Sequence, residues 1–281
     1  MPDENKNIIK NEQTKGLKRN TIDKFYTKDT IVNQCIDIIK KNNNIENNHL
    51  IIEPSAGNGA FIKEIKKLSN NFKFYDIDPE HEEIIKQDFL ELENPTSDNK
   101  IHIIGNPPFG RQSSMAIKFI KKSCEFAQTI SFILPKSFKK DSLKKHFDKY
   151  FHLINEIDLA DNSFLVNNEE TDVPCIFQIW EKKEEAREEL TILKPINFIF
   201  VKKEENPDIA FRRVGVNAGT ITRDIVDSSI QSHYFIKFTN NKGLNDNIKK
   251  IKNITYEFNN TVGPKSISKQ ELISQFNPLL V

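Results

Sequence analysis

Residues 51–59 are Ile-Ile-Glu-Pro-Ser-Ala-Gly-Asn-Gly, a glycine-containing loop between a buried strand expected over His49–Glu53 and a helix expected over Gly59–Leu68. Glycines in such a loop let a ligand approach the backbone, and ligands of open α/β sheets bind at the carboxyl ends of strands. The loop is not G-x-G-x-x-G and has no Lys-Ser/Thr ending, which disfavours a dinucleotide site or a P-loop. By itself, the loop is also compatible with an ordinary tight turn.

Strands and helices alternate on both sides of this loop. Apolar spacing predicts an amphipathic helix over Thr30–Ile39. Further strands are expected at Phe72–Ile77, Lys86–Phe89, Ile101–Gly105 and Thr129–Leu134, with helices starting at Pro79 and over Ser113–Ala127. Two longer strands, Phe151–Leu159 and Val173–Glu181, predict an antiparallel hairpin that closes the sheet. The pattern indicates an α/β fold, a mostly parallel sheet with helices on both faces.

The charged run 181–189 marks the expected end of this domain. Beyond it, short β-prone segments at Asn197–Val201, Ile209–Val214 and His233–Phe238 are followed by Ser268 and Glu271, a capping-box pair. We therefore expect a disordered tail over residues 1–20, an α/β domain over 21–183 and a small C-terminal α+β domain over 190–281.

Composition excludes a membrane protein and indicates no metal site. The 281 residues have a mean hydropathy of −0.56, and no apolar stretch approaches the roughly 20 residues of a spanning helix. The N-terminus has no apolar segment typical of a signal peptide, so an intracellular protein, cytoplasmic or nuclear, is expected. Cys35, Cys124 and Cys175 each lie in an apolar pattern, which favours reduced core thiols.

Two acidic positions follow the glycine loop at informative places. Asp76 ends the second strand, where doubly wound nucleotide folds place a carboxylate for ribose hydroxyls. Asp78 is expected to point the other way and to cap the helix starting at Pro79. Asp88 and Phe89 end the third strand, where Asp88 has the chemistry to accept from an adenine amino group and Phe89 to pack on a purine; a simple turn is the alternative.

The segment Asn106-Pro107-Pro108-Phe109 directly follows the strand Ile101–Gly105. Its prolines lack backbone donors and keep the chain extended, which leaves the Asn106 amide and the Pro107 carbonyl for a ligand. Together they offer acceptors for both hydrogens of an exocyclic amino group, while Phe109 is placed to stack on its ring. A purely structural turn is the other interpretation.

The order and spacing of these motifs over about Phe25–Glu181 resemble the amino-group methyltransferases, and among them the adenine-N6 enzymes. The resemblance implies a Rossmann-like seven-stranded methyltransferase sheet, S-adenosyl-L-methionine as cofactor and a nucleic-acid partner. It further implies roles for individual residues. Around the cofactor these are Tyr26 and Thr27 in the N-terminal cofactor segment, Glu53, Ser55, Ala56, Gly57 and Gly59 around the methionine part, Asp76 at the ribose, Asp88 and Phe89 at the adenine, and Ile77 as a further cofactor-binding residue. Phe164 is expected to stack on the extruded target base.

The substrate is left open by two departures from that pattern. Phe109 stands where many DNA enzymes have tyrosine, and Asn-Pro-Pro-Phe also occurs in RNA adenine methyltransferases. The C-terminal appendage is also shorter than the usual target-recognition domain. DNA is the first choice and RNA the close alternative, followed by a protein glutamine, whose amide also carries two hydrogens, and by a catalytically silent binding subunit.

Two basic segments are candidates for contact with nucleic acid. Lys139 and Lys140 lie in the lysine-rich stretch 136–149, which is equally compatible with a solvated helix face. Arg212 and Arg213 precede a loop that contains Gly215 and Gly219, and arginine is suited to bind phosphate or guanine through two hydrogen bonds. An ordinary turn with surface arginines is the alternative.

Overall fold

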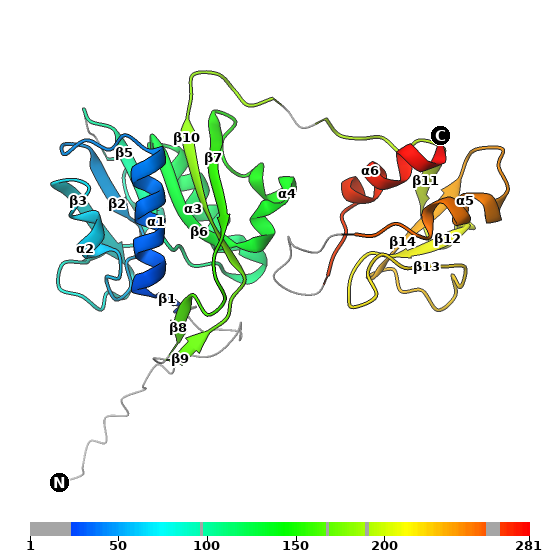
Figure 1. Ribbon diagram of the computed structural model, residues 1–281, viewed down its shortest axis with the longest axis horizontal. Coiled ribbons are helices and arrows are strands. Elements are labelled where there is room, and N and C mark those ends of the chain that lie inside the picture. The colour runs from blue at the N-terminus through cyan, green and yellow to red at the C-terminus, as the bar shows by residue number, and fades with distance from the viewer. Residues whose placement is uncertain (1–23, 96–97, 167–168, 189–190, 257–264) are drawn as a thin grey trace, which may run out of the picture. The chain divides into compact units, whose positions relative to one another are not determined.

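The computed structural model describes residues 24–95, 98–166, 169–188, 191–256 and 265–281, so the expected tail over 1–20 lies outside the described residues. The chain forms two compact units, one ending at Arg187 and the other beginning at Glu188 (Figure 1). Within the described part, no helix is both long enough and apolar enough to cross a membrane.

The first unit is built on a seven-stranded sheet. In spatial order its strands are β4 (Ile85–Lys86), β3 (Asn71–Asp76), β2 (Leu50–Glu53), β5 (Ile101–Gly105), β6 (Thr129–Pro135), β10 (Cys175–Lys182) and β7 (Phe151–Asp158). The first five run parallel, and β10 pairs antiparallel with both β6 and β7. This confirms the Rossmann-like seven-stranded sheet and its closing antiparallel hairpin.

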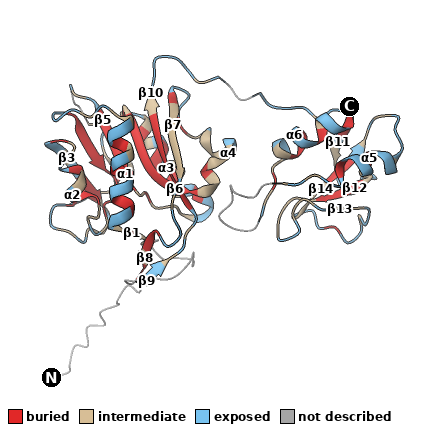
Figure 2. Cartoon of the chain, in the orientation of Figure 1, coloured by how far each residue is buried: buried red, intermediate tan, exposed pale blue. Residues whose placement is uncertain are grey.

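Helices cover both faces of this sheet, because successive strand residues are buried on opposite sides. Ile51 and Ile104 pack in one apolar cluster with helices α1 (Asp29–Asn42) and α2 (Ile62–Ile65). Ile52 and Ile103 pack in a second cluster with α3 (Ser114–Cys124). Figure 2 shows these strands as a buried layer. Because β2 pairs parallel with both β3 and β5, the carboxyl ends of these three strands lie side by side at one edge of the sheet.

No helix begins at Pro79, contrary to the sequence-based prediction. The chain after β3 forms turns that lead into β4, and the Glu80 backbone N–H donates to the Gly57 carbonyl at 3.0 Å. This bond ties the segment to the glycine loop instead of to a helix of its own. Helix α2 is likewise shorter than the expected 59–68.

Two other regions of the first unit differ from expectation. The lysine-rich stretch contains only short helices, η3 (Lys136–Lys139) and α4 (Asp141–Lys144). The connection between β7 and β10 is not a simple loop: β8 (Phe164–Val166) and β9 (Glu169–Thr171) form a hairpin that also pairs with β1 (Tyr26–Thr27). The remaining elements of this unit are the 3-10 turns η1 (Phe89–Glu91) and η2 (Arg111–Ser113).

The second unit is a four-stranded antiparallel sheet packed against two helices. Its strands, in spatial order, are β11 (Phe198–Val201), β14 (His233–Phe238), β12 (Ile209–Arg212) and β13 (Ile221–Thr222). Helices α5 (Leu244–Ile251) and α6 (Lys269–Leu280) contribute to its apolar core. The predicted capping box at the start of α6 is confirmed, because Glu271 N donates to Ser268 Oγ and Ser268 N donates to Glu271 Oε2. Helix α5 was not expected from the sequence.

Candidate active site

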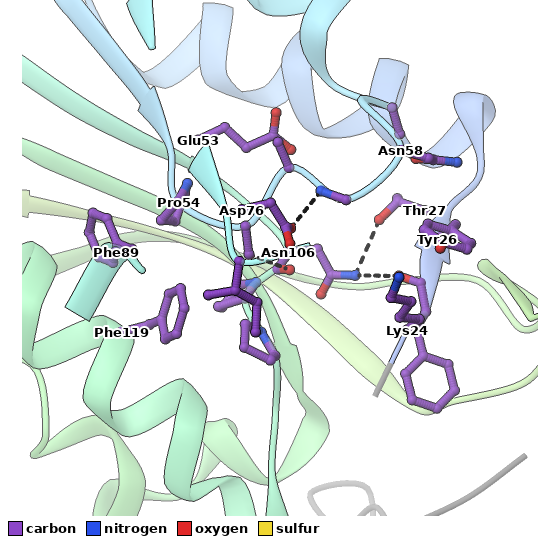
Figure 3. Close-up of a pocket in the computed structure, with 18 of the residues that line it drawn as sticks. Lys24, Tyr26, Thr27, Glu53, Pro54, Asn58, Asp76, Phe89, Asn106 and Phe119 are labelled. Atoms are coloured by element: carbon purple, nitrogen blue, oxygen red, sulfur yellow. Dashed lines mark hydrogen bonds between the residues drawn. The ribbon is translucent and has the colours of Figure 1, made fainter. Parts of the chain in front are cut away.

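A pocket lies at the carboxyl ends of β2, β3 and β5 and brings together most of the residues singled out in the sequence (Figure 3). Its wall includes Lys24–Thr27, Glu53–Asn58, Asp76–Asp78, Asp88, Phe89 and Asn106–Phe109, with Met115 and Phe119 from helix α3. The glycine loop and the Asn-Pro-Pro-Phe motif thus share one cavity, although they are about 50 residues apart in the chain.

Asp76 braces the glycine loop from the neighbouring strand. Its Oδ2 accepts from the Gly57 backbone N–H at 2.8 Å, and its Oδ1 accepts from the Asp78 backbone N–H at 2.8 Å. Gly57 has a φ of 53° and Gly59 a φ of 84°, a region that favours glycine. Each carboxylate oxygen has a second lone pair, so Asp76 is able to accept from a ligand hydroxyl as well.

Glu53 is a buried acid at the end of β2, only 2% exposed. Burial raises the pKa of its carboxyl well above the usual range, and the charge of Asp76 raises that pKa further. Among the described residues, no group forms a hydrogen bond with its Oε2 atom. A positively charged ligand in the pocket would favour the ionised form and give this oxygen a partner.

Ile77 adds open apolar surface to the wall of the pocket. This residue is 53% exposed. Phe89 lines the same pocket but is only 1% exposed and stacks on Phe119 with ring centroids 5.4 Å apart. Asp88 accepts from the Leu90 backbone N–H at 2.8 Å and so caps the η1 turn. Ile77 therefore presents more open apolar surface than Phe89.

Asn106 is held at the end of β5 by three hydrogen bonds. Its Nδ2 donates to the Phe25 carbonyl at 3.2 Å and to Thr27 Oγ1 at 3.3 Å, as the dashed lines in Figure 3 mark. Its backbone carbonyl accepts from Ser55 Oγ at 3.1 Å. The side-chain Oδ1 is buried, and no hydrogen-bond partner for it exists in the described part of the chain. The pocket thus contains a buried acceptor suited to a donor from a ligand.

Phe109 is anchored to the start of helix α3. Its carbonyl accepts from the Met115 N–H at 3.1 Å and from the Ala116 N–H at 3.3 Å. The intervening loop includes Gln112 and Ser113, both with positive φ (53° and 61°), which non-glycine residues adopt at an energetic cost. The packed helix keeps this strained loop in place and with it the position of Phe109.

Several site expectations need correction. Phe164 is fully buried, pairs through β8 with β1 and packs edge-on against Phe25, so it has no free face for an extruded base. Asp78 caps no helix but forms an ion pair with Lys24 at 2.7 Å. Gly59 lies in the loop but not in the wall of the pocket, because its backbone is packed under Ile62 and His81.

The expected substrate-binding lysines and arginines lie outside this pocket. Lys139 pairs with Asp158 at 2.8 Å, so part of the positive charge of its stretch is neutralised, and Lys140 follows it at the end of η3. Arg212 turns back to donate from Nε to the Val214 carbonyl at 3.0 Å. Arg213 donates to the Gln231 carbonyl and lies 5.5 Å from the Tyr234 ring centre.

Sequence reasoning missed the contribution of Lys24 and Phe119 to the pocket. Lys24 Nζ pairs with Asp78 at 2.7 Å and with Glu80 at 2.6 Å, and Tyr26 Oη donates to Glu80 at 2.6 Å. No local pattern links Lys24 to acids more than 50 residues away. Phe119 lies at a spacing typical of the apolar face of the helix expected over Ser113–Ala127, but such spacing does not separate a pocket wall from the core.

No family model matches the chain. Over 104 residues the chain is 33% identical to the Type II methyltransferase M.HincII of Haemophilus influenzae and to the Type II methyltransferase M.HindII of another strain of that species. Each match covers 35% of this chain but 19% of the relative, so the chain matches only about a fifth of the length of these curated relatives.

Solved structures with a similar fold include the 23S rRNA methyltransferase ErmE, which is 14% identical with a TM-score of 0.43 over 59% of this chain and 73% of ErmE. A type I restriction-modification methyltransferase subunit from Streptococcus thermophilus is 15% identical with a TM-score of 0.44, over 57% of this chain and 45% of the subunit. Each of these four proteins carries the name methyltransferase.

Proposed function

We propose that this protein is an S-adenosylmethionine-dependent methyltransferase that methylates the N6 amino group of adenine in nucleic acid, with DNA as the first choice of substrate. The observation that carries the proposal is the buried Oδ1 of Asn106, which has no partner among the described residues and lies in one pocket with the glycine loop. A buried acceptor without a partner is costly unless a ligand supplies the donor.

The hydrogen-bond acceptors and apolar side chains that line the pocket fit the cofactor. When bound, S-adenosylmethionine supplies a methyl group on a positively charged sulfonium. Asp76 would accept from the ribose hydroxyls, the exposed Ile77 would cover the adenine ring, and the buried Glu53 carboxyl would face a cationic part of the ligand. These groups all surround the same cavity, which supports the proposed cofactor.

The Asn-Pro-Pro-Phe motif would hold and orient the substrate amino group. Asn106 Oδ1 and the Pro107 carbonyl accept its two hydrogens, and Phe109 stacks on the ring that carries it. Held in this way, the amino nitrogen would have its lone pair directed toward the methyl donor. No side chain needs to remove a proton before the nitrogen reacts. Once the nitrogen carries the methyl group and S-adenosylhomocysteine is left, one of the two held protons would pass to solvent.

The choice of DNA draws on the two relatives from Haemophilus influenzae, both named Type II methyltransferases. Adenine in RNA stays the close alternative because Phe109 lacks the hydroxyl of a tyrosine. A protein glutamine presents the same two hydrogens to Asn106, and a catalytically silent subunit would keep the pocket without turnover. None of these alternatives has a specific contact in its favour.

Contact with nucleic acid by the second unit is part of the proposal. From Glu188 onward the chain has 13 basic and ten acidic residues. On this unit Lys269 Nζ lies 4.6 Å from the Phe200 ring centre, and Arg213 lies 5.5 Å from that of Tyr234. Cations beside aromatic rings suit phosphates and unstacked bases, so this group, Phe200, Arg213, Tyr234 and Lys269, is the candidate contact surface.

A product analysis tests the proposed function. The protein is incubated with isotope-labelled S-adenosylmethionine and matched pools of DNA, RNA and protein, and the digested products are identified by mass spectrometry. We expect labelled N6-methyladenine from DNA, and about 100-fold less, or lower still, with the Asn106→Ala variant. Label in RNA or in glutamine would instead identify RNA or protein as the substrate. If cofactor binding is verified and no pool is labelled, the result would favour a catalytically silent subunit.

A further inference from the structure

Both hydrogens of the Asn106 side-chain amide are already used inside the protein. One goes to the Phe25 carbonyl at 3.2 Å and the other to Thr27 Oγ1 at 3.3 Å (Figure 3). A carbonyl oxygen only accepts, so an amide rotated by 180° would set Asn106 Oδ1 against the Phe25 carbonyl. The observed orientation is therefore favoured, and Oδ1 is the one polar atom of the amide left for a ligand.

The two acceptors lie on a segment that is itself held in place. Thr27 is 6% exposed and pairs with Phe164 in the sheet formed by β1 and β8. The Phe164 ring packs edge-on against Phe25 with centroids 6.3 Å apart. On the other side, Lys24 is bound by Asp78 and Glu80. Strand β1 thus connects the hairpin between β7 and β10 to the side chain of Asn106.

We propose that Thr27 is a positioning residue for Asn106: its hydroxyl, with the Phe25 carbonyl, occupies both amide hydrogens, so that the site offers a pure acceptor to a substrate NH2. The inference rests on the proposed amino-group methyl transfer and goes beyond the cofactor contact expected of Thr27. It also bears on specificity, because a pure acceptor binds an amino group and repels the carbonyl edge of a thymine or guanine.

The test compares two substitutions of Thr27. Thr27→Val keeps the shape but removes the hydroxyl, and Thr27→Ser keeps the hydroxyl. Loss of one aligned hydrogen bond should lower kcat of Thr27→Val about tenfold, with a much smaller change in the Kd for S-adenosylmethionine, and Thr27→Ser should recover most of the rate. Thr30→Val, on an exposed residue at the start of α1, is the matched control.

A second readout follows the amide itself without turnover. The side-chain 15N–1H resonances of Asn106, identified by their loss in Asn106→Ala, should shift and exchange faster with water in Thr27→Val but not in Thr27→Ser. Unchanged resonances and kcat in Thr27→Val would overturn the positioning role, as would a raised Kd for the cofactor with kcat unchanged. If the wild-type protein methylates nothing, the proposed function fails, while the resonances still report whether Thr27 orients Asn106.

Discussion

Asn106 is the residue whose loss should affect chemistry most and cofactor binding least. Asn106→Ala removes the buried acceptor but leaves the glycine loop and Asp76 in place. We expect turnover to fall by about 100-fold or more, because one polar group aligned on a reacting atom commonly contributes that much. Single-turnover kinetics with excess enzyme measure the step, and calorimetry checks that the Kd for S-adenosylmethionine is retained. A variant with more than about a tenth of the wild-type rate would contradict the role.

Glu53 gives the free protein a pH dependence of stability. Burial raises the pKa of its carboxyl, so the folded protein keeps a proton that the unfolded chain releases above the ordinary glutamate pKa of about 4.3. The contribution of Glu53 to the free energy of unfolding therefore falls as pH rises. Glu53→Gln does not ionise, so its Tm should exceed that of the wild type by a margin that grows from pH 5 to pH 8.

The same substitution should weaken the binding of S-adenosylmethionine, because the neutral amide offers a cationic ligand no charge. Thermal unfolding over pH and calorimetry measure the two effects. A Tm difference that does not change with pH would contradict the stability argument. A folded Glu53→Gln variant with unaltered cofactor affinity would remove Glu53 from the binding site without affecting that argument.

At the scale of elements, strand β7 partly neutralises the lysine-rich stretch. Lys139 pairs with Asp158 at 2.8 Å and Lys144 with Glu156 at 3.0 Å. Each lysine that contacts a phosphate contributes about 0.9 to the slope of log binding constant against log salt on duplex DNA. We exchange Lys139, Lys140, Lys144 and Lys145 for glutamine. Because some of these lysines are already paired with acids, the slope should become flatter by clearly less than the amount that four phosphate contacts would contribute. The control exchanges Lys66 and Lys67 near α2, and an identical slope in both variants would indicate that the stretch only faces solvent.

At the scale of the whole molecule, the second unit is expected to bind substrate and not cofactor. Arg213→Gln with Lys269→Gln should raise the KM for nucleic acid about tenfold, since two cations next to aromatic rings are lost. The Kd for S-adenosylmethionine and the unfolding of the first unit should not change. Lys249→Gln with Lys250→Gln, on exposed positions of α5, is the matched control. Equal KM values for the two double variants would exclude this surface from substrate binding.

The sequence alone was sufficient for features that depend on neighbouring residues. The run Ile101–Gly105 forms β5 with the predicted bounds, because a mostly apolar segment this short, followed by glycine and proline, is typical of a strand buried on both faces. Ser268 and Glu271 cap α6 as predicted, since a capping box involves residues three positions apart. One feature that joins distant segments was also predictable. The glycine loop and the Asn106 motif share a pocket because parallel strands end at the same edge of a sheet.

Only the tertiary structure decided how side chains far apart in the chain meet. Phe164 was expected to stack on an extruded base, yet its strand pairs with β1 and buries the ring. Lys139 forms an ion pair with Asp158, and the acceptors that hold the Asn106 amide come from Phe25 and Thr27, about 80 residues earlier. Local spacing determines which face of an element is apolar, but long-range strand pairing determines which partner a polar group finds, and that partner sets its chemistry.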